Sequence, residues 1–81
     1  MNLTTTTSLQ ELQVGDKGRV IGFTAAGKLY RKKLLSMGLT RGADFSVTRY
    51  APMGDPVEIQ VRGYSLSLRK KEAAAVLVER R

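Results

Sequence analysis

Apolar and polar residues alternate with a period of two over much of the chain, which predicts a series of short β-strands. The segments that show this alternation, or a run of β-favouring residues, are 17–24, 44–50, 57–61, 64–68 and 76–79. Only Arg62 and Gly63 separate the third segment from the fourth. A hairpin loop of that length places Val61 and Tyr64 on the same face, which we expect to point toward the core. Gly22, inside the first segment, indicates a bulge or a tight bend.

One longer segment, 28–37, follows a helical period instead, and the Gly38 that follows it is a typical residue to end a helix. At about 100° per residue, Tyr30, Leu34 and Met37 fall on one face of this helix. We expect that face to pack on the core. The opposite side is rich in basic residues.

The remaining segments complete a single domain. Residues 1–7 include a run of four threonines and are expected to form a flexible tail, so that the domain comprises residues 8–81. A Ser8-x-x-Glu11 capping box predicts a short helical turn at the start of the domain. A second helical turn is predicted over 69–74, before the last strand.

Five short strands with one inserted helix predict a mainly β fold, a small SH3-like barrel, because closing a sheet into a barrel removes its exposed edges. The helix lies between the first and second predicted strands. An oligonucleotide-binding barrel normally carries its helix between the third and fourth strands, so that architecture fits poorly. An SH3-like barrel has a long first connection and a helical turn before its last strand, as here.

Composition excludes several kinds of chemistry. The 81 residues include no cysteine and no histidine. Thiol catalysis, Ser-His-Asp triads and zinc hydrolase sites are therefore excluded. The seven acidic residues are scattered over different turns and strands, so we expect no metal site and no cofactor. The longest apolar stretch, 73–78, is far too short to span a membrane, which favours a cytoplasmic protein.

The charge points to an acidic partner. The net charge is +7 and the sequence pI is about 10.3. Residues 28–33 contain four basic and no acidic residues, and residues 69–81 contain five basic and two acidic ones. Nucleic acid is the first partner to consider. However, the chain has only five aromatic residues, and Tyr50, beside Arg49, is the single candidate for an exposed stacking platform.

A near-match to a phosphate-binding loop lies at the start of the predicted helix. Gly22, Gly27 and Lys28 satisfy the pattern G-x-x-x-x-G-K, but Leu29 occupies the position where a Ser or Thr would hold magnesium. The chain also has no predicted parallel α/β sheet. We therefore interpret this segment as the end of a strand followed by a basic helix start.

Three apolar residues have no place in the predicted core: Leu29, Leu35 and Met53. Either the mouth of the barrel covers them, or they form an exposed apolar patch bordered by cations. The second arrangement is typical of a protein-binding surface.

Most of the chain also follows a known family pattern. The residues that carry it are Leu9, Leu12, Gly15, Gly18 and Val20, then Arg31, Leu34, Met37, Gly38, Leu39 and Gly42, then Ala51, Pro52, Met53, Gly54, Asp55, Pro56 and Val57, and finally Leu66, Leu68, Arg69, Glu72 and Ala73. This pattern resembles the ferrous iron transport protein A family, FeoA. The segments Gly38-Leu39 and Gly54-Asp55-Pro56 are its most specific parts.

The resemblance implies an SH3-like fold, a cytosolic location in bacteria and no enzymatic activity. It also implies a partner, the membrane transporter called ferrous iron transport protein B, which carries a cytosolic G-protein-like domain. The expected contact residues are Leu29, Arg31, Lys32, Lys33, Leu35 and Met53. The alternative is a small basic barrel that binds nucleic acid through residues 28–33 and the C-terminal arginines. Self-association is left open.

Overall fold

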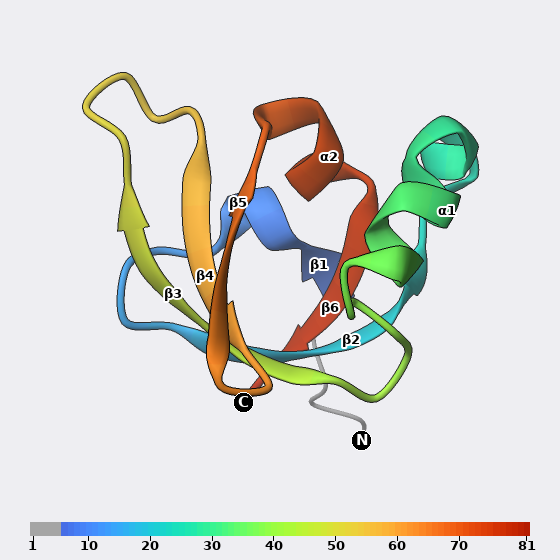
Figure 1. Cartoon of the computed structure of the whole chain (residues 1–81), viewed down its shortest axis with the longest axis horizontal. Coiled ribbons are helices and arrows are strands. Elements are labelled where there is room, and N and C mark those ends of the chain that lie inside the picture. Colours follow the sequence, from blue (N-terminus) through green and yellow to red (C-terminus); the bar gives the residue numbers. More distant parts are fainter. Residues whose placement is uncertain (1–5) are drawn as a thin grey trace.

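Six strands within residues 6–81, the part of the chain that the computed structural model describes, form one strongly curved antiparallel sheet (Figure 1). The strands are β1 (Thr6–Ser8), β2 (Lys17–Phe23), β3 (Asp44–Tyr50), β4 (Val57–Val61), β5 (Tyr64–Leu68) and β6 (Val76–Arg80). Their order in the sheet is β1-β6-β2-β3-β4-β5. The mainly β fold expected from the alternating pattern is confirmed.

Two α-helices and two 3-10 turns connect these strands. They are α1 (Lys28–Ser36), α2 (Lys70–Ala74), η1 (Leu9–Glu11) and η2 (Ala25–Gly27). Helix α1 lies in the chain between β2 and β3, and α2 immediately precedes β6, both as predicted. Figure 1 shows α2 over the open end of the curved sheet and α1 projecting beside it.

The curved sheet encloses the core, and η1 and α1 each add one leucine to it, Leu9 and Leu34. The buried apolar residues are Leu9, Leu12, Val20, Leu34, Leu39, Ala43, Phe45, Val47, Val57, Ile59, Val61, Leu68, Ala73, Ala75, Val76 and Val78. Tyr30 and Met37 pack against this core from the same helix face as Leu34, as the helical period predicted. The predicted bulge in β2 is also present, since its register with β6 shifts between Val20 and Gly22.

The sequence failed to predict β1. Thr6 and Thr7 were expected in a tail, but they pair with Glu79 and Val78 of β6. Residues 1–5 of that expected tail lie outside the described residues. The capping box was also wrong in detail, because the Ser8 side chain makes no capping hydrogen bond to η1. A three-residue strand of threonine and serine carries no alternating pattern of apolar and polar residues. The strand is defined by its pairing with β6, which the local sequence does not indicate.

Tyr64 corrects a second expectation. Its pairing with Val61 across the hairpin is as predicted, but Tyr64 is 42% exposed rather than part of the core. Tyr64 begins β5 next to the hairpin loop, and its ring reaches the end of α1. There its hydroxyl donates a 2.5 Å hydrogen bond to the Met37 carbonyl. Gly38, at φ +97°, ends the helix directly beside that hydroxyl, where a Cβ would overlap it.

Candidate functional site

Helix α1 is attached to the rest of the protein through one face. Leu34 is fully buried, and Tyr30 and Met37 pack against the core from the same side. At the C-terminal end, the Arg62 side chain donates to Thr40 Oγ1 at 2.8 Å, which ties the β4–β5 hairpin to the segment after the helix. The remaining faces of α1 point away from the sheet.

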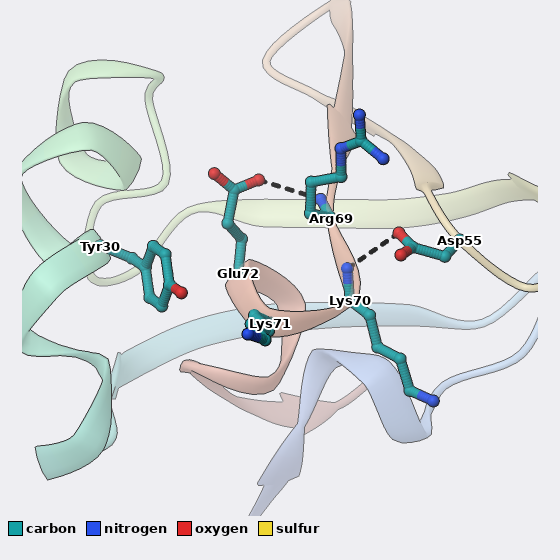
Figure 2. A pocket seen from close by; sticks show the side chains of 6 residues that line it. All are labelled: Tyr30, Asp55, Arg69, Lys70, Lys71 and Glu72. Atoms are coloured by element: carbon teal, nitrogen blue, oxygen red, sulfur yellow. Dashed lines mark hydrogen bonds between the residues drawn. The ribbon is translucent and has the colours of Figure 1, made fainter.

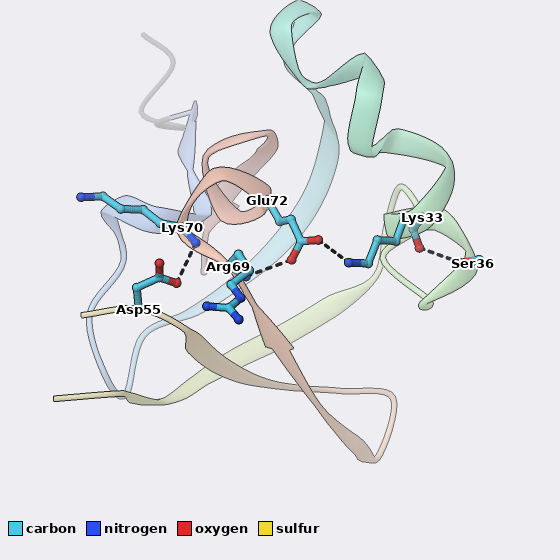
Figure 3. A network of polar contacts seen from close by, with 6 residues as sticks. All are labelled: Lys33, Ser36, Asp55, Arg69, Lys70 and Glu72. Carbon is cyan, nitrogen blue, oxygen red and sulfur yellow. Dashed lines mark hydrogen bonds and ion pairs between the residues drawn. The ribbon is translucent and has the colours of Figure 1, made fainter. Parts of the chain in front are cut away.

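A polar network braces α1 against α2 (Figure 3). Lys33 Nζ lies 2.6 Å from Glu72 Oε2, and the other carboxylate oxygen of Glu72 accepts a hydrogen bond from the Arg69 amide at 2.9 Å. Glu72 is only 5% exposed. Burial acts to raise its pKa, but the hydrogen bonds from Lys33 and Arg69 outweigh burial and hold the pKa of Glu72 below its usual value. Lys33, one of the expected contact residues, is therefore held in an intramolecular ion pair.

Four of the expected contact residues share the outward surface of α1. Leu29 is 89% exposed, Leu35 is 37% exposed, and Arg31 and Lys32 are both exposed. Neither cation forms an ion pair with any residue in the described part of the chain. We call Leu29, Arg31, Lys32 and Leu35 the α1 outer face. It combines exposed apolar groups with uncompensated positive charge.

The sixth expected residue, Met53, does not join this surface. It is 91% exposed, as its turn predicted, but it lies on the β3–β4 loop. Figure 1 shows that loop and α1 at opposite ends of the molecule, with α2 between them. The sequence indicates that Met53 is exposed, but only the fold shows that it lies far from α1.

A groove between the two helices was not predicted. Figure 2 shows this groove, which has a volume of about 410 Å³. It is lined by Tyr30, Asp55, Arg69, Lys70, Lys71 and Glu72. Asp55 Oδ1 accepts a 3.0 Å hydrogen bond from the Lys70 amide and so fixes the β3–β4 loop at one edge. These residues come from three segments far apart in the chain, and the basic run 69–71 is the one signal that the sequence offers.

The side chains that could contact nucleic acid, Tyr50 and the C-terminal arginines, form contacts within the fold instead. Tyr50, the candidate stacking residue, is half-buried, and its hydroxyl donates to the carbonyls of Gln10 and Leu12. Burial raises the pKa of Tyr50, with smaller effects from nearby acidic residues. At the C-terminus, Arg80 lies 3.7 Å from the Asp16 carboxylate, and Arg81 pairs with an acidic neighbour on β6. Tyr50, the single candidate from the sequence, therefore does not provide an exposed stacking platform.

Packing accounts for the glycine pattern that resembles a phosphate loop. A Cβ at Gly27 would lie 2.5 Å from Ala75 Cβ, so the absence of a side chain lets the start of α1 approach the junction between α2 and β6 closely. The Gly27 amide donates to the Thr24 carbonyl at 3.0 Å, and the Thr24 amide donates to the Ala75 carbonyl at 2.9 Å. Both amides are therefore used within the fold.

Residues 6–81 hold no cluster of three or more acidic side chains that could bind a metal ion, and histidine and cysteine are absent from the chain. Within the same range, none of the helices has the length and apolar character needed to cross a bilayer.

Comparison with known families identifies the domain. A family model described as the FeoA domain matches residues 7–80. The chain belongs to the FeoA family. A FeoA-like protein from Clostridium acetobutylicum is 42% identical and superposes with a TM-score of 0.87, covering 96% of this chain and 90% of that one. Stenotrophomonas maltophilia FeoA, a prokaryotic SH3-domain protein solved in complex with zinc, is 25% identical with a TM-score of 0.75 over 89% of this chain and 88% of that one. The SH3-like class expected from the sequence is confirmed.

One FeoA relative is joined to a transporter. A fusion of Fe(2+) transport protein A with the Fe(2+) transporter FeoB, from Porphyromonas gingivalis (strain ATCC BAA-308 / W83), is 37% identical over 71 residues. The match covers 88% of this chain and 8% of the fusion protein. The FeoA family is thus linked to ferrous iron transport.

Proposed function

We propose that this FeoA-family protein is a non-enzymatic, cytoplasmic accessory protein of ferrous iron uptake. It binds the membrane ferrous iron transporter, ferrous iron transport protein B, which recruits it to the inner face of the membrane. The contact is made by the α1 outer face. The observation that carries this proposal is the near-complete exposure of Leu29 beside Arg31 and Lys32, which form no ion pair within residues 6–81.

Exposed apolar groups bordered by cations are typical of protein-binding surfaces. The fusion relative supports the identity of the partner, because it places a domain similar to this chain in one polypeptide with a ferrous iron transporter. Leu29 and Leu35 would supply the apolar contact, while Arg31 and Lys32 would speed association with an acidic surface. Lys33 would contribute indirectly, by holding α1 against α2.

The test is co-purification of this protein with the full-length transporter, and then with the soluble G domain of the transporter alone. Leu29→Gln should weaken binding by more than about 1 kcal/mol if Leu29 is an anchor. Replacing Arg31 and Lys32 by glutamate should slow association, with an effect that shrinks at high salt. Met53→Gln is the matched control, because Met53 is as exposed as Leu29 but lies at the other end of the molecule. Equal losses in Leu29→Gln and Met53→Gln would reject the α1 outer face as the contact.

Two further measurements separate this proposal from other functions. Titration of the protein with mixed-sequence oligonucleotides should show weak binding that falls log-linearly with salt and does not saturate at a defined site. Anaerobic calorimetry with ferrous iron should show at most weak, millimolar-range binding to surface carboxylates, since imidazole and thiolate ligands are absent. A stoichiometric iron site of micromolar affinity would favour an iron-carrying protein instead.

A further inference from the structure

A basic hollow lies beside the start of α1, where the chain leaves β2. Its volume is about 180 Å³. It is lined by Phe23, Thr24, Ala25, Lys28, Arg31 and Arg41. Lys28 and Arg31 come from successive turns of α1, and Arg41 comes from the loop between α1 and β3. The hollow therefore joins three segments and adds two cations, Lys28 and Arg41, to the charge of the α1 outer face.

The backbone holds Arg41 in this position. On the residue that follows it, the Gly42 amide donates to the Val20 carbonyl at 2.7 Å, and the Val20 amide donates in turn to the Ala43 carbonyl at 2.9 Å. These bonds fasten the loop to β2 just before its bulge. Arg41 Nη2 then lies 3.9 Å from the point where Gly22 would carry a Cβ. The guanidinium therefore lies beside the strand, at van der Waals distance from that point.

Within the described residues, no ion pair offsets the positive charge of the hollow. No acidic residue lines it. None of Lys28, Arg31 and Arg41 forms an ion pair with another residue between 6 and 81. By contrast, Arg19 pairs with Asp44 at 3.0 Å, and Lys33 pairs with Glu72. Three cations held around one small hollow repel one another, and a bound anion would relieve that repulsion.

The chemistry of the hollow favours a carboxylate over a nucleotide phosphate. A phosphate loop presents free backbone amides, whereas the amides of Gly27 and Thr24 are already used within the fold. Two arginines instead offer planar guanidinium groups, which match the two oxygens of a carboxylate. Phe23 provides an apolar wall against which the methylene groups of an acidic side chain can pack.

We propose that the basic hollow receives an aspartate or glutamate side chain from an acidic segment of the protein that docks on the α1 outer face. This inference rests on the proposed function, because Arg31 belongs to both surfaces and Leu29 adjoins Lys28 in the chain. It adds Arg41 and Lys28 as specificity-determining residues, and it predicts that the partner carries a carboxylate beside its apolar contact.

The first experiment uses this protein and an acetylated hexaglutamate peptide. Titration followed by ¹⁵N NMR should give saturable shifts at the amides of Thr24, Ala25 and Lys28. Arg41→Gln should weaken binding of the peptide at least about tenfold, the loss expected for one charge-assisted hydrogen bond. Arg49→Gln is the matched control, because it removes the same charge from an exposed site on β3 and should leave the affinity within about twofold. Equal losses in the two variants, or shifts that never saturate, would overturn the proposal.

Parallel titrations identify the kind of anion. Inorganic phosphate, and vesicles containing phosphatidylglycerol, should bind more weakly than the peptide and without dependence on Arg41. Tighter binding of either probe that Arg41→Gln abolishes would assign the hollow to phosphate groups and reject the acidic segment.

Binding of the full-length transporter separates this proposal from the broader one. We expect both Leu29→Gln and Arg41→Gln to weaken it, while Arg49→Gln does not. Loss in Leu29→Gln alone would keep the accessory function and reject the hollow. If the wild-type protein does not bind the transporter but binds the peptide through Arg41, the accessory function fails and the acidic-segment site stands with another partner.

Discussion

Replacing Leu34 by alanine and Leu29 by glutamine tests whether one side of α1 stabilises the fold while the other side is free to bind a partner. The two leucines are about 1.4 turns apart on the same short helix. Yet Leu34 is fully buried and Leu29 is almost fully exposed. Truncating a buried leucine removes apolar contacts and leaves a cavity, which costs about 2–5 kcal/mol. Since a chain of this size has a total stability of roughly 4–12 kcal/mol, Leu34→Ala removes a large part of it.

The same reasoning gives a small stability cost for Leu29→Gln. Glutamine and leucine have similar helix propensities, and an exposed substitution that touches no cap or ion pair changes stability by within about 0.5 kcal/mol. Leu35 is intermediate, because its 37% exposure means that most of the side chain is covered. A fully buried leucine is worth about 1.5–3 kcal/mol, so Leu35→Gln should cost about 1–2 kcal/mol. The sequence placed both leucines outside the predicted core, and the structure limits the expectation of a small stability cost to Leu29.

Thermal unfolding followed by far-UV circular dichroism measures these differences. For a domain of this size, each kcal/mol shifts Tm by about 4–8 °C. Leu34→Ala should therefore lower Tm by about 8 °C or more, Leu35→Gln by several degrees, and Leu29→Gln by less than about 4 °C. Urea unfolding at constant temperature gives the free energies directly and checks that the slope m is unchanged. If Leu29→Gln lowers Tm as far as Leu34→Ala does, Leu29 is a core residue and the α1 outer face must be withdrawn.

Three more predictions concern the contacts that hold the two helices and the hairpin. Glu72→Gln should cost about 1–2 kcal/mol in urea unfolding at pH 7, since it weakens the bonds from Lys33 and the Arg69 amide. The folded pKa of Glu72 is lowered, so its contribution is present above the ordinary value of 4.5, and the gap between wild type and variant should close as pH falls through and below that value. Gly38→Ala should lower Tm strongly, because the residue has φ +97° and its Cβ would overlap the Tyr64 hydroxyl; an unchanged Tm would refute that packing. Tyr50→Phe should cost about 1 kcal/mol in the same assay by removing the hydroxyl bond to η1 and the residue after it, and no loss would mean that the bond is not formed.

The strands and the main helix could be predicted from the sequence because each has a local cause. The alternation in β4 and the two-residue loop after it set the pairing of Val61 with Tyr64, and that register is observed. The helical period placed Leu34 in the core for the same reason. Local patterns could not find β1, which has no alternation and depends on β6, a strand almost seventy residues away along the chain.

The candidate site was predictable in composition but not in arrangement. Helix geometry is local, so the sequence could place Leu29, Arg31 and Lys32 together on the outside of α1. Met53 was assigned to the same surface because exposure can be read from a turn, whereas position depends on the whole fold. Arg41 was missed for the converse reason: it reaches the start of α1 only because its loop pairs with β2.

The distribution of charge pairs supports the proposal that the surface of α1 serves recognition rather than folding. Ion pairs join distant parts of the chain where they brace the fold, as between Lys33 and Glu72 or between Arg19 and Asp44. Around α1, however, Lys28, Arg31 and Arg41 lie close together with no acidic residue among the side chains that line the hollow. Their mutual repulsion opposes folding. Because Leu29 is exposed, its side chain contributes almost no burial free energy to the stability of the domain. A helix selected only for stability would carry acidic residues in its first turn, where α1 has none. The proposed partner would supply the missing negative charge beside these cations and would cover the exposed Leu29. The protein should therefore become more stable when that partner binds.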